Sequence, residues 1–165
     1  MPSSKTPLQR PAQRPDLPAL PPFETLDATH RQVLRSIDQL LRVVEQLGAE
    51  AVDEATRKQV AAICQFLDDT ARAHHAVEEA SVFPALLQSG DDALVQHVQR
   101  LQQDHGWLEQ DWLELQPQLK AVAEGMSWYD PDYLRVAMPI FAKLYRDHIA
   151  LEESIVYPAS QRLRG

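Results

Sequence analysis

The residues most able to do chemistry in this chain of 165 residues form a motif that occurs twice. In each copy a histidine is followed four residues later by glutamate and ten residues later by proline: His74, Glu78 and Pro84, then His148, Glu152 and Pro158. Another histidine, His30 or His105, precedes each copy by 44 or 43 residues. Imidazole and carboxylate groups together suit iron, manganese or zinc. The repeat therefore predicts a two-fold metal site.

Each of the four histidines fills a gap in an apolar stripe with helical spacing. The apolar residues beside them are Leu26 and Val33, Leu67 and Ala71, Leu101 and Leu108, and Leu144 and Ile155, in chain order. Side chains four residues apart on a helix lie on the same face. Each glutamate is therefore expected to project inward beside its histidine.

The depth of the histidines along their helices agrees with a shared site. At about 1.5 Å per residue, His30 lies about 27 Å before the first predicted turn and His74 about 30 Å after it. His74 and His105 lie about 20 Å on either side of the second turn. His105 and His148 lie about 30 Å and 27 Å from the third. Four helices running up and down would bring all four histidines to nearly one level.

The competing interpretation is a buried network of histidine and glutamate without metal. A single histidine on an apolar face is more often a hydrogen-bonded core residue than a ligand. A network of four imidazoles and two carboxylates would leave several lone pairs unpaired, which is costly in a core. No Arg or Lys lies on the apolar stripes to pair with the carboxylates, so metal is the favoured partner.

Neighbouring polar residues are assigned other roles. His75 and Glu79 repeat the four-residue spacing in a shifted register, but the histidine is not duplicated in the second copy, so His75 is interpreted as a flanking residue. Glu79 and Glu153 are expected to support the ligands or to pair with neighbouring helices. Tyr145 could reach the site as a hydrogen-bond donor, although packing is favoured for it, and Tyr157 is assigned to packing.

Four amphipathic helices must position these residues, at about 27–47, 53–88, 91–124 and 130–163. Gly48 and Gly125 suit helix ends, and Asp130-Pro131 suits a helix start. Short connections and the lack of strand alternation predict an all-α, up-down-up-down four-helix bundle. Four prolines fall inside the helices and predict kinks or interruptions there: Pro84, Pro117, Pro139 and Pro158.

The segment 1–22 contains seven of the twelve prolines and has almost no periodic apolar pattern. Proline blocks helix and removes backbone donors, which predicts a flexible tail at 1–22 and a bundle domain at 23–165.

Bulk composition narrows the classes of protein. The net charge of −8 argues against a nucleic-acid-binding surface. The single cysteine, Cys64, excludes an internal disulfide framework, fits a reducing compartment and lies in an apolar run. No stretch approaches the ~18 apolar residues of a membrane helix, and the N-terminus lacks an apolar signal region. A cytoplasmic protein without a membrane partner is the resulting expectation.

Two strings carry a resemblance to a known family. They are the residues 73–84, AHHAVEEASVFP, and the residues 148–158, HIALEESIVYP. His30 and His105 precede these strings by similar numbers of residues. With them, the chain resembles the hemerythrin-like family, or HHE cation-binding domain, over about residues 25–163. Ferritin-like di-iron bundles use Glu-x-x-His pairs, a different order and spacing.

The resemblance implies a four-helix bundle that holds two iron ions bridged by an oxo or hydroxo group, with manganese or zinc less favoured. It implies that His30 and His74 serve one iron, that His105 and His148 serve the other, and that Glu78 and Glu152 bridge the two.

Glu109 departs from the family pattern. Oxygen-carrying hemerythrins have a further histidine at this position, four residues after the counterpart of His105. Glu109 is therefore interpreted as a ligand or near-ligand. A second ambiguity is whether Glu152 or Glu153 bridges; stripe position and the internal repeat favour Glu152.

Three functions compete. The leading hypothesis is a di-iron protein that binds or senses dioxygen, or a related small oxidant, and handles iron, rather than an oxygen carrier or an enzyme. The first alternative is a di-iron oxidase or peroxide-decomposing enzyme, favoured by the extra carboxylate of Glu109. The second is a metal-free helical interaction module. The redox partner and the oligomeric state are not encoded in any motif.

Overall fold

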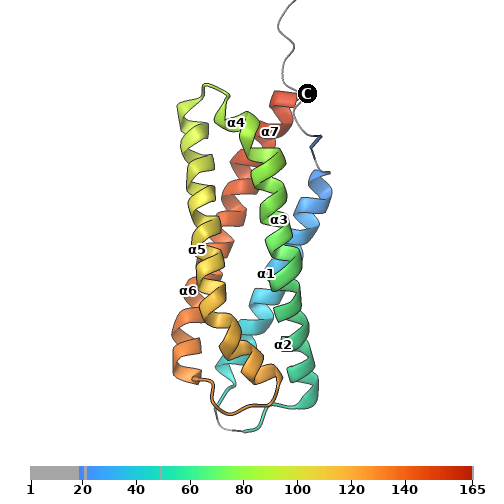
Figure 1. Ribbon diagram of the computed structural model, residues 1–165, viewed down its shortest axis with the longest axis vertical. Coiled ribbons are helices and arrows are strands. Elements are labelled where there is room, and N and C mark those ends of the chain that lie inside the picture. Colours follow the sequence, from blue (N-terminus) through green and yellow to red (C-terminus); the bar gives the residue numbers. More distant parts are fainter. Residues whose placement is uncertain (1–18, 21, 49, 165) are drawn as a thin grey trace, which may run out of the picture.

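The computed structural model of the protein describes residues 19–20, 22–48 and 50–164. Four helical segments run side by side along its long axis and are joined by turns at the two ends (Figure 1). The first is α1 (Phe23–Glu45), and the third is α5 (Asp92–Ala123). The second comprises α2 (Glu54–Phe66), η1 (Leu67–Ala71), α3 (Arg72–Val77), η2 (Glu78–Val82) and α4 (Phe83–Leu87). The fourth comprises α6 (Pro131–Leu151), η3 (Glu152–Val156) and α7 (Tyr157–Arg164). The three elements marked η are π-helical turns.

Aspartates begin three of the four segments. The Asp53 carboxylate accepts the backbone N–H of residue 56 at 2.7 Å, and Asp91 accepts that of residue 94 at 3.1 Å. Asp130 does the same at the start of α6, as its position before a proline predicts. After α1 and α5 the chain turns at Gly48 and Gly125, whose φ angles of +110° and +71° favour glycine.

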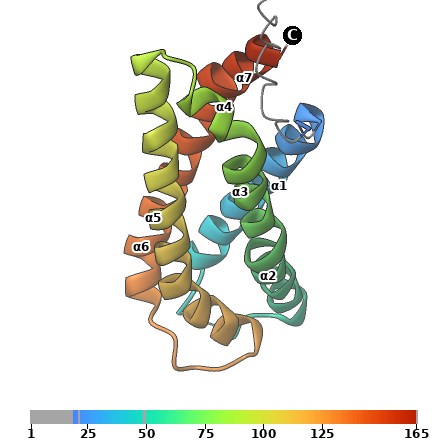
Figure 2. The same cartoon turned by 45° about the horizontal axis from the view of Figure 1, so that its top comes forward.

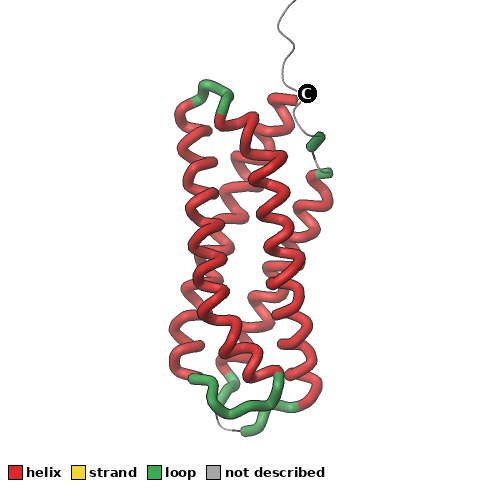
Figure 3. Tube along the Cα trace, viewed as in Figure 1, coloured by secondary structure: helices red, strands yellow, loops and turns green. Residues whose placement is uncertain are grey.

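The segments pack as an antiparallel bundle, with α2 against α5, α5 against α6 and α6 against α1. A view turned by 45° shows the same four columns (Figure 2). The secondary structure of the described residues is helix joined by loops, without a strand (Figure 3). The predicted all-α, up-down-up-down four-helix bundle is confirmed. The predicted tail falls mainly on residues 1–18 and 21, which lie outside the described residues.

The apolar core is divided into two clusters by a polar layer. One cluster extends from Val33 toward the turns after α1 and α5, and the other surrounds α4 and α7. His30 lies between Leu26 of one cluster and Val33 of the other, and His105 lies between Leu101 and Leu108 in the same way. The histidines and glutamates of the repeated motif therefore form a separate polar layer across the bundle.

The internal prolines have two different outcomes. Pro84 and Pro158 follow the π-helical turns η2 and η3 at a distance of two residues, so an interruption occurs where it was predicted. Pro117 and Pro139 instead lie inside the continuous helices α5 and α6. Both are exposed, so water can hydrate the carbonyls that they leave without a donor, and the helix continues.

Cys64 is buried in the core, as predicted, and burial is the main cause that raises the pKa of its thiol to about 12. Within the described part of the chain, every helix is too short or too polar to cross a membrane.

Candidate metal centre

The polar layer brings together six side chains that the sequence analysis singled out. All six are buried, and Glu78 and Glu152 have no exposed surface. The group comprises His30 from α1, His74 from α3, Glu78 from η2, His105 from α5, His148 from α6 and Glu152 from η3. The helical depth count thus predicted their common level correctly.

The four imidazoles form two pairs. His30 and His74 approach each other most closely, with their Nε2 atoms 3.0 Å apart. The rings of His105 and His148 have centroids 4.8 Å apart. Each pair comes from one helical hairpin, the first two segments for His30 and His74 and the last two for His105 and His148.

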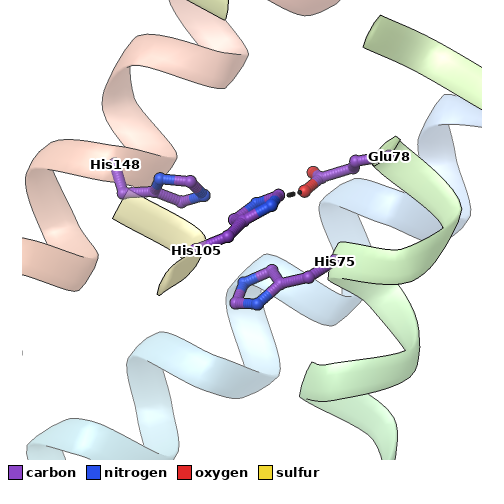
Figure 4. A group of neighbouring side chains, drawn as sticks. All are labelled: His75, Glu78, His105 and His148. Atoms are coloured by element: carbon purple, nitrogen blue, oxygen red, sulfur yellow. Dashed lines mark ion pairs between the residues drawn. The ribbon is translucent and has the colours of Figure 1, made fainter. Parts of the chain in front are cut away.

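Each carboxylate connects the two pairs. Glu78 lies 2.9 Å from His74 Nε2 through Oε1. Its Oε2 lies 3.0 Å from His105 Nε2 (Figure 4). Glu152 lies 2.8 Å from His30 Nε2 through Oε2, while its Oε1 contacts His148 Nε2. The glutamate of each hairpin therefore reaches a histidine of the other. This is the arrangement that bridging carboxylates between two ions require.

A partly exposed group of three side chains, Asp27, His30 and Glu153, has ligand atoms within 4.8 Å of one another, and so do two groups of four in the polar layer. The groups of four are His30, His74, Glu78 and Glu152, and His75, Glu78, His105 and His148. Glu78 belongs to both. Either group offers enough nitrogen and oxygen donors for a metal ion.

His75 corrects the sequence interpretation, which treated it as a flanking residue. Its ring stacks on that of His105 with centroids 4.1 Å apart, and the two rings lie next to His148 and Glu78 (Figure 4). Its Nε2 lies 3.3 Å from the Tyr145 hydroxyl, so Tyr145 does reach the site. Burial and the neighbouring imidazoles lower the pKa of His75 to about 2, which keeps its ring neutral.

Glu109 lies outside both groups. Its side chain is 47% exposed and forms an ion pair with Arg72 of α3. Its position four residues after His105 predicted a ligand or near-ligand role, and the structure instead places it at the surface. This placement removes the extra carboxylate on which the enzymatic alternative rested.

Carboxylates hold the outer nitrogens of three imidazoles. His30 Nδ1 donates to Glu153 at 2.9 Å, and His105 Nδ1 donates to Glu79 at 2.8 Å. Glu79 and Glu153 were expected to support the ligands in this way. Such bonds fix the tautomer and aim the Nε2 lone pair inward.

Asp104 plays the same part for His148, with its Oδ2 3.4 Å from the Nδ1 of that ring. The repeated motif did not indicate Asp104. The sequence feature that could have indicated Asp104 is Arg100, four residues earlier on α5. Arg100 pairs with the other carboxylate oxygen of Asp104 at 2.9 Å.

Tyr157 is the second residue that sequence reasoning missed. Its hydroxyl donates to Glu78 and lies 3.2 Å from His30 Nε2 and 3.4 Å from Glu152 Oε2. Burial and the two carboxylates raise the pKa of this phenol, so its proton stays on the oxygen. Tyr157 therefore caps the His30 side of the layer.

The charges within the layer are tightly linked. Burial lowers the pKa of His105, but its close contacts with the carboxylates of Glu152 and Glu78 outweigh burial and raise it to about 10. For His148 burial is likewise outweighed, by Asp104 and Glu152, and its pKa rises to about 9. Burial would raise the pKa of Glu152, yet close contacts with the imidazoles hold it well below its usual range. The carboxylates thus demand positive charge, which protons or metal ions can supply.

Four side-chain atoms that could coordinate a metal face one another, and within the described structure none of them makes a hydrogen bond of acceptable geometry. They are Glu78 Oε2, Glu152 Oε1, His105 Nε2 and His148 Nε2. These atoms contact one another as ion pairs but lack hydrogen-bond geometry, and burying a polar atom without a good hydrogen bond costs on the order of 1–3 kcal/mol. A cation coordinated by these atoms would satisfy all four, so the residues fit a metal.

The comparisons with known proteins agree with this chemistry. The family model described as hemerythrin HHE cation binding domain matches residues 22–160. Searches of curated proteins and of solved structures gave no significant match. Because the family model covers most of the sequence, the chain belongs to the hemerythrin HHE cation-binding domain family.

Proposed function

We propose that the chain holds two iron ions in its polar layer and binds or senses dioxygen or a related small oxidant. The observation that carries this proposal is that each of the two carboxylates reaches from its own helical hairpin to a histidine of the other. Glu78 and Glu152 each contact one histidine of both pairs, which is how a carboxylate would span two ions.

Iron is proposed because the donors are imidazoles and carboxylates without a thiolate, and because of the resemblance to hemerythrins. Manganese and zinc accept the same donors and are less favoured. The one cysteine lies in the apolar core cluster, outside both ligand groups.

The residues of the chain would divide the work. Glu153, Glu79 and Asp104 hold imidazoles in orientation through their Nδ1 atoms. Tyr157 and the two apolar clusters limit access of water on the His30 side. Bound iron would supply a redox-active Lewis acid with which an oxygen species can interact.

Metal analysis of the purified protein, prepared with ample iron, tests the proposal. We expect about two irons per chain, and a large loss in His74→Ala and His148→Ala because each removes one donor from a different pair. His97→Ala is the matched control, since His97 is half-buried and belongs to neither group. An iron-replete preparation that contains no iron would overturn the proposal.

Rapid mixing of the reduced protein with oxygen tests the second half. Binding predicts a reversible spectral change that disappears when oxygen is removed. Rapid oxidation that repeats with a supplied reductant would instead establish turnover and overturn binding as the function.

A further inference from the structure

A pocket of about 520 Å³ opens between the second segment and α5 and reaches the polar layer. Its mouth includes the exposed Arg72 and Glu109, while its walls include the buried Leu108, Phe141 and Tyr145. A volume of this size falls in the range of sites for small organic ligands, about 300–1,000 Å³.

The inner end of the pocket is shared with the candidate metal centre. His75 and His105 line the pocket, and both belong to one of the two ligand groups. Tyr145, whose hydroxyl lies 3.3 Å from His75 Nε2, lines it as well. An imidazole and a phenol at one end can hydrogen-bond a hydroxyl group of a ligand.

The charge of the lining selects against ions. Four carboxylates line the pocket, those of Asp68, Asp69, Glu79 and Glu109. Arg72 is the one Arg or Lys among the described lining residues, and it is already paired with Glu109. The positive charge of metal at the inner end would be offset by Glu78, Glu152 and the carboxylates that hold the imidazoles, so the carboxylates of the pocket still repel an anion and anionic ligands are disfavoured.

A divalent cation would be attracted to the mouth but not farther in. The deeper wall is made of apolar residues such as Leu67, Leu108 and Phe141. An ion that loses its hydration shell there gives up hydration free energy that contacts with apolar side chains cannot replace. Aromatic and aliphatic walls instead favour an apolar body.

We propose that this pocket binds a small neutral organic molecule, with an apolar body and one hydroxyl-bearing end, beside the His75–His105 side of the metal centre. This inference rests on the proposed function, because it names the class of molecule that would share the centre with the oxidant.

Gly106 and Ala76 provide the means to block the pocket. Both are small, exposed lining residues, from α5 and α3 respectively. A Cβ added at Gly106 would meet nothing within 4 Å. Phenylalanine at either position has room to enter the mouth, whereas alanine at Gly106 leaves most of the space open.

The test uses ¹⁹F NMR of 4-fluorophenol with the iron-loaded full chain. We expect saturable binding with a Kd near or below about 1 mM, as a ligand of this size allows. The anion 4-fluorobenzoate should bind at least about tenfold more weakly because of the carboxylates at the mouth. Fluorine relaxation should be faster with reduced iron than with zinc in the centre, since high-spin iron(II) is paramagnetic and the pocket ends beside it.

Gly106→Phe and Ala76→Phe should each weaken 4-fluorophenol binding at least about tenfold. Gly106→Ala and Ala93→Phe are the controls, because the first adds little volume and the second adds an exposed aromatic outside the pocket. The two blocking variants lie on different helices, so a folding failure in one leaves the other as a test.

Iron content, measured on the same samples, separates the two proposals. Binding of 4-fluorophenol by an iron-replete preparation that contains no iron would overturn the proposed function and leave the pocket intact. Iron-loaded protein that ignores 4-fluorophenol, or blocking variants that bind it normally, would overturn the pocket. Slower iron loading in those variants without loss of 4-fluorophenol binding would mark a metal entry route instead.

Discussion

At the residue scale, Glu109 and Glu152 show that the same offset from a histidine can lead to opposite environments. Each lies four residues after a histidine of the layer. Glu152 has no exposed surface and contacts His30 and His148, whereas Glu109 is about half exposed and pairs with Arg72. The spacing of four residues therefore does not identify a ligand unless the face of the helix is also known.

Substitution of these two glutamates should separate them. Glu152→Gln should remove at least about half of the bound iron, because it replaces a carboxylate that reaches both histidine pairs. Glu109→Gln should retain the iron of the unaltered protein, since its carboxylate lies outside both groups. Elemental analysis measures both, and iron loss in Glu109→Gln equal to that in Glu152→Gln would contradict this assignment.

At the scale of elements, the π-helical turns position the glutamates. The backbone N–H of Phe83 donates to the carbonyl of Glu78, and that of Tyr157 donates to the carbonyl of Glu152. Both are bonds across five residues, and in both cases the donor immediately precedes a proline. The proline cannot donate to a carbonyl four residues earlier, so the backbone ahead of it is free to take the wider spacing.

Pro158→Ala should therefore disturb the centre from outside it. Restoring the N–H favours a regular α-helix through η3, which turns Glu152 and Tyr157 relative to each other. We expect iron affinity to fall about tenfold or more, as for the loss of a residue that orients a ligand.

Pro139→Ala is the matched control, because Pro139 lies on the same segment inside regular α-helix. Iron titration against a competing chelator measures both variants. Equal affinities in Pro158→Ala and the unaltered protein would contradict a positioning role for η3.

These turns also explain what could and could not be predicted from the sequence. Apolar periodicity and turn residues predicted four helices and the common depth of His30, His74, His105 and His148, because both depend only on rise per residue. Which side chain faces inward depends on rotation, and regular α-helical rotation was assumed.

Tyr157 lies five residues after Glu152, which in an α-helix would place the two on different faces. The π-helical turn brings Tyr157 back to the layer, and the proline that follows was its only sequence signal. His75 lies between two such turns, η1 and η2, so its facing was misjudged for the same reason.

At the scale of the whole molecule, the polar layer lies between two apolar clusters that cannot replace its charges. The pKa of His105 is raised to about 10 and that of His148 to about 9 by contacts present only in the folded chain. Groups with a raised folded pKa stabilise the fold fully below their unfolded pKa of about 6.5. That stabilisation is lost as the pH rises through the folded values.

Metal-free protein should therefore lose stability between about pH 6.5 and pH 10, by about 2 kcal/mol or more. Iron-loaded protein should lose much less over the same range, because the metal replaces the protons at these nitrogens. Urea unfolding at several pH values, with and without a chelator, measures the difference. Parallel pH profiles for the two forms would show that protons do not substitute for metal in this layer.

The crossing of Glu78 and Glu152 makes each helical hairpin an incomplete chelator. The first hairpin supplies His30 and His74, and Glu152 of the second hairpin contacts His30. The second hairpin supplies His105 and His148, and Glu78 of the first hairpin contacts His105. Chelation and closure of the two halves are then a single event. If the chain were cut in the turn between α4 and α5, the bound cation would hold the two resulting fragments together.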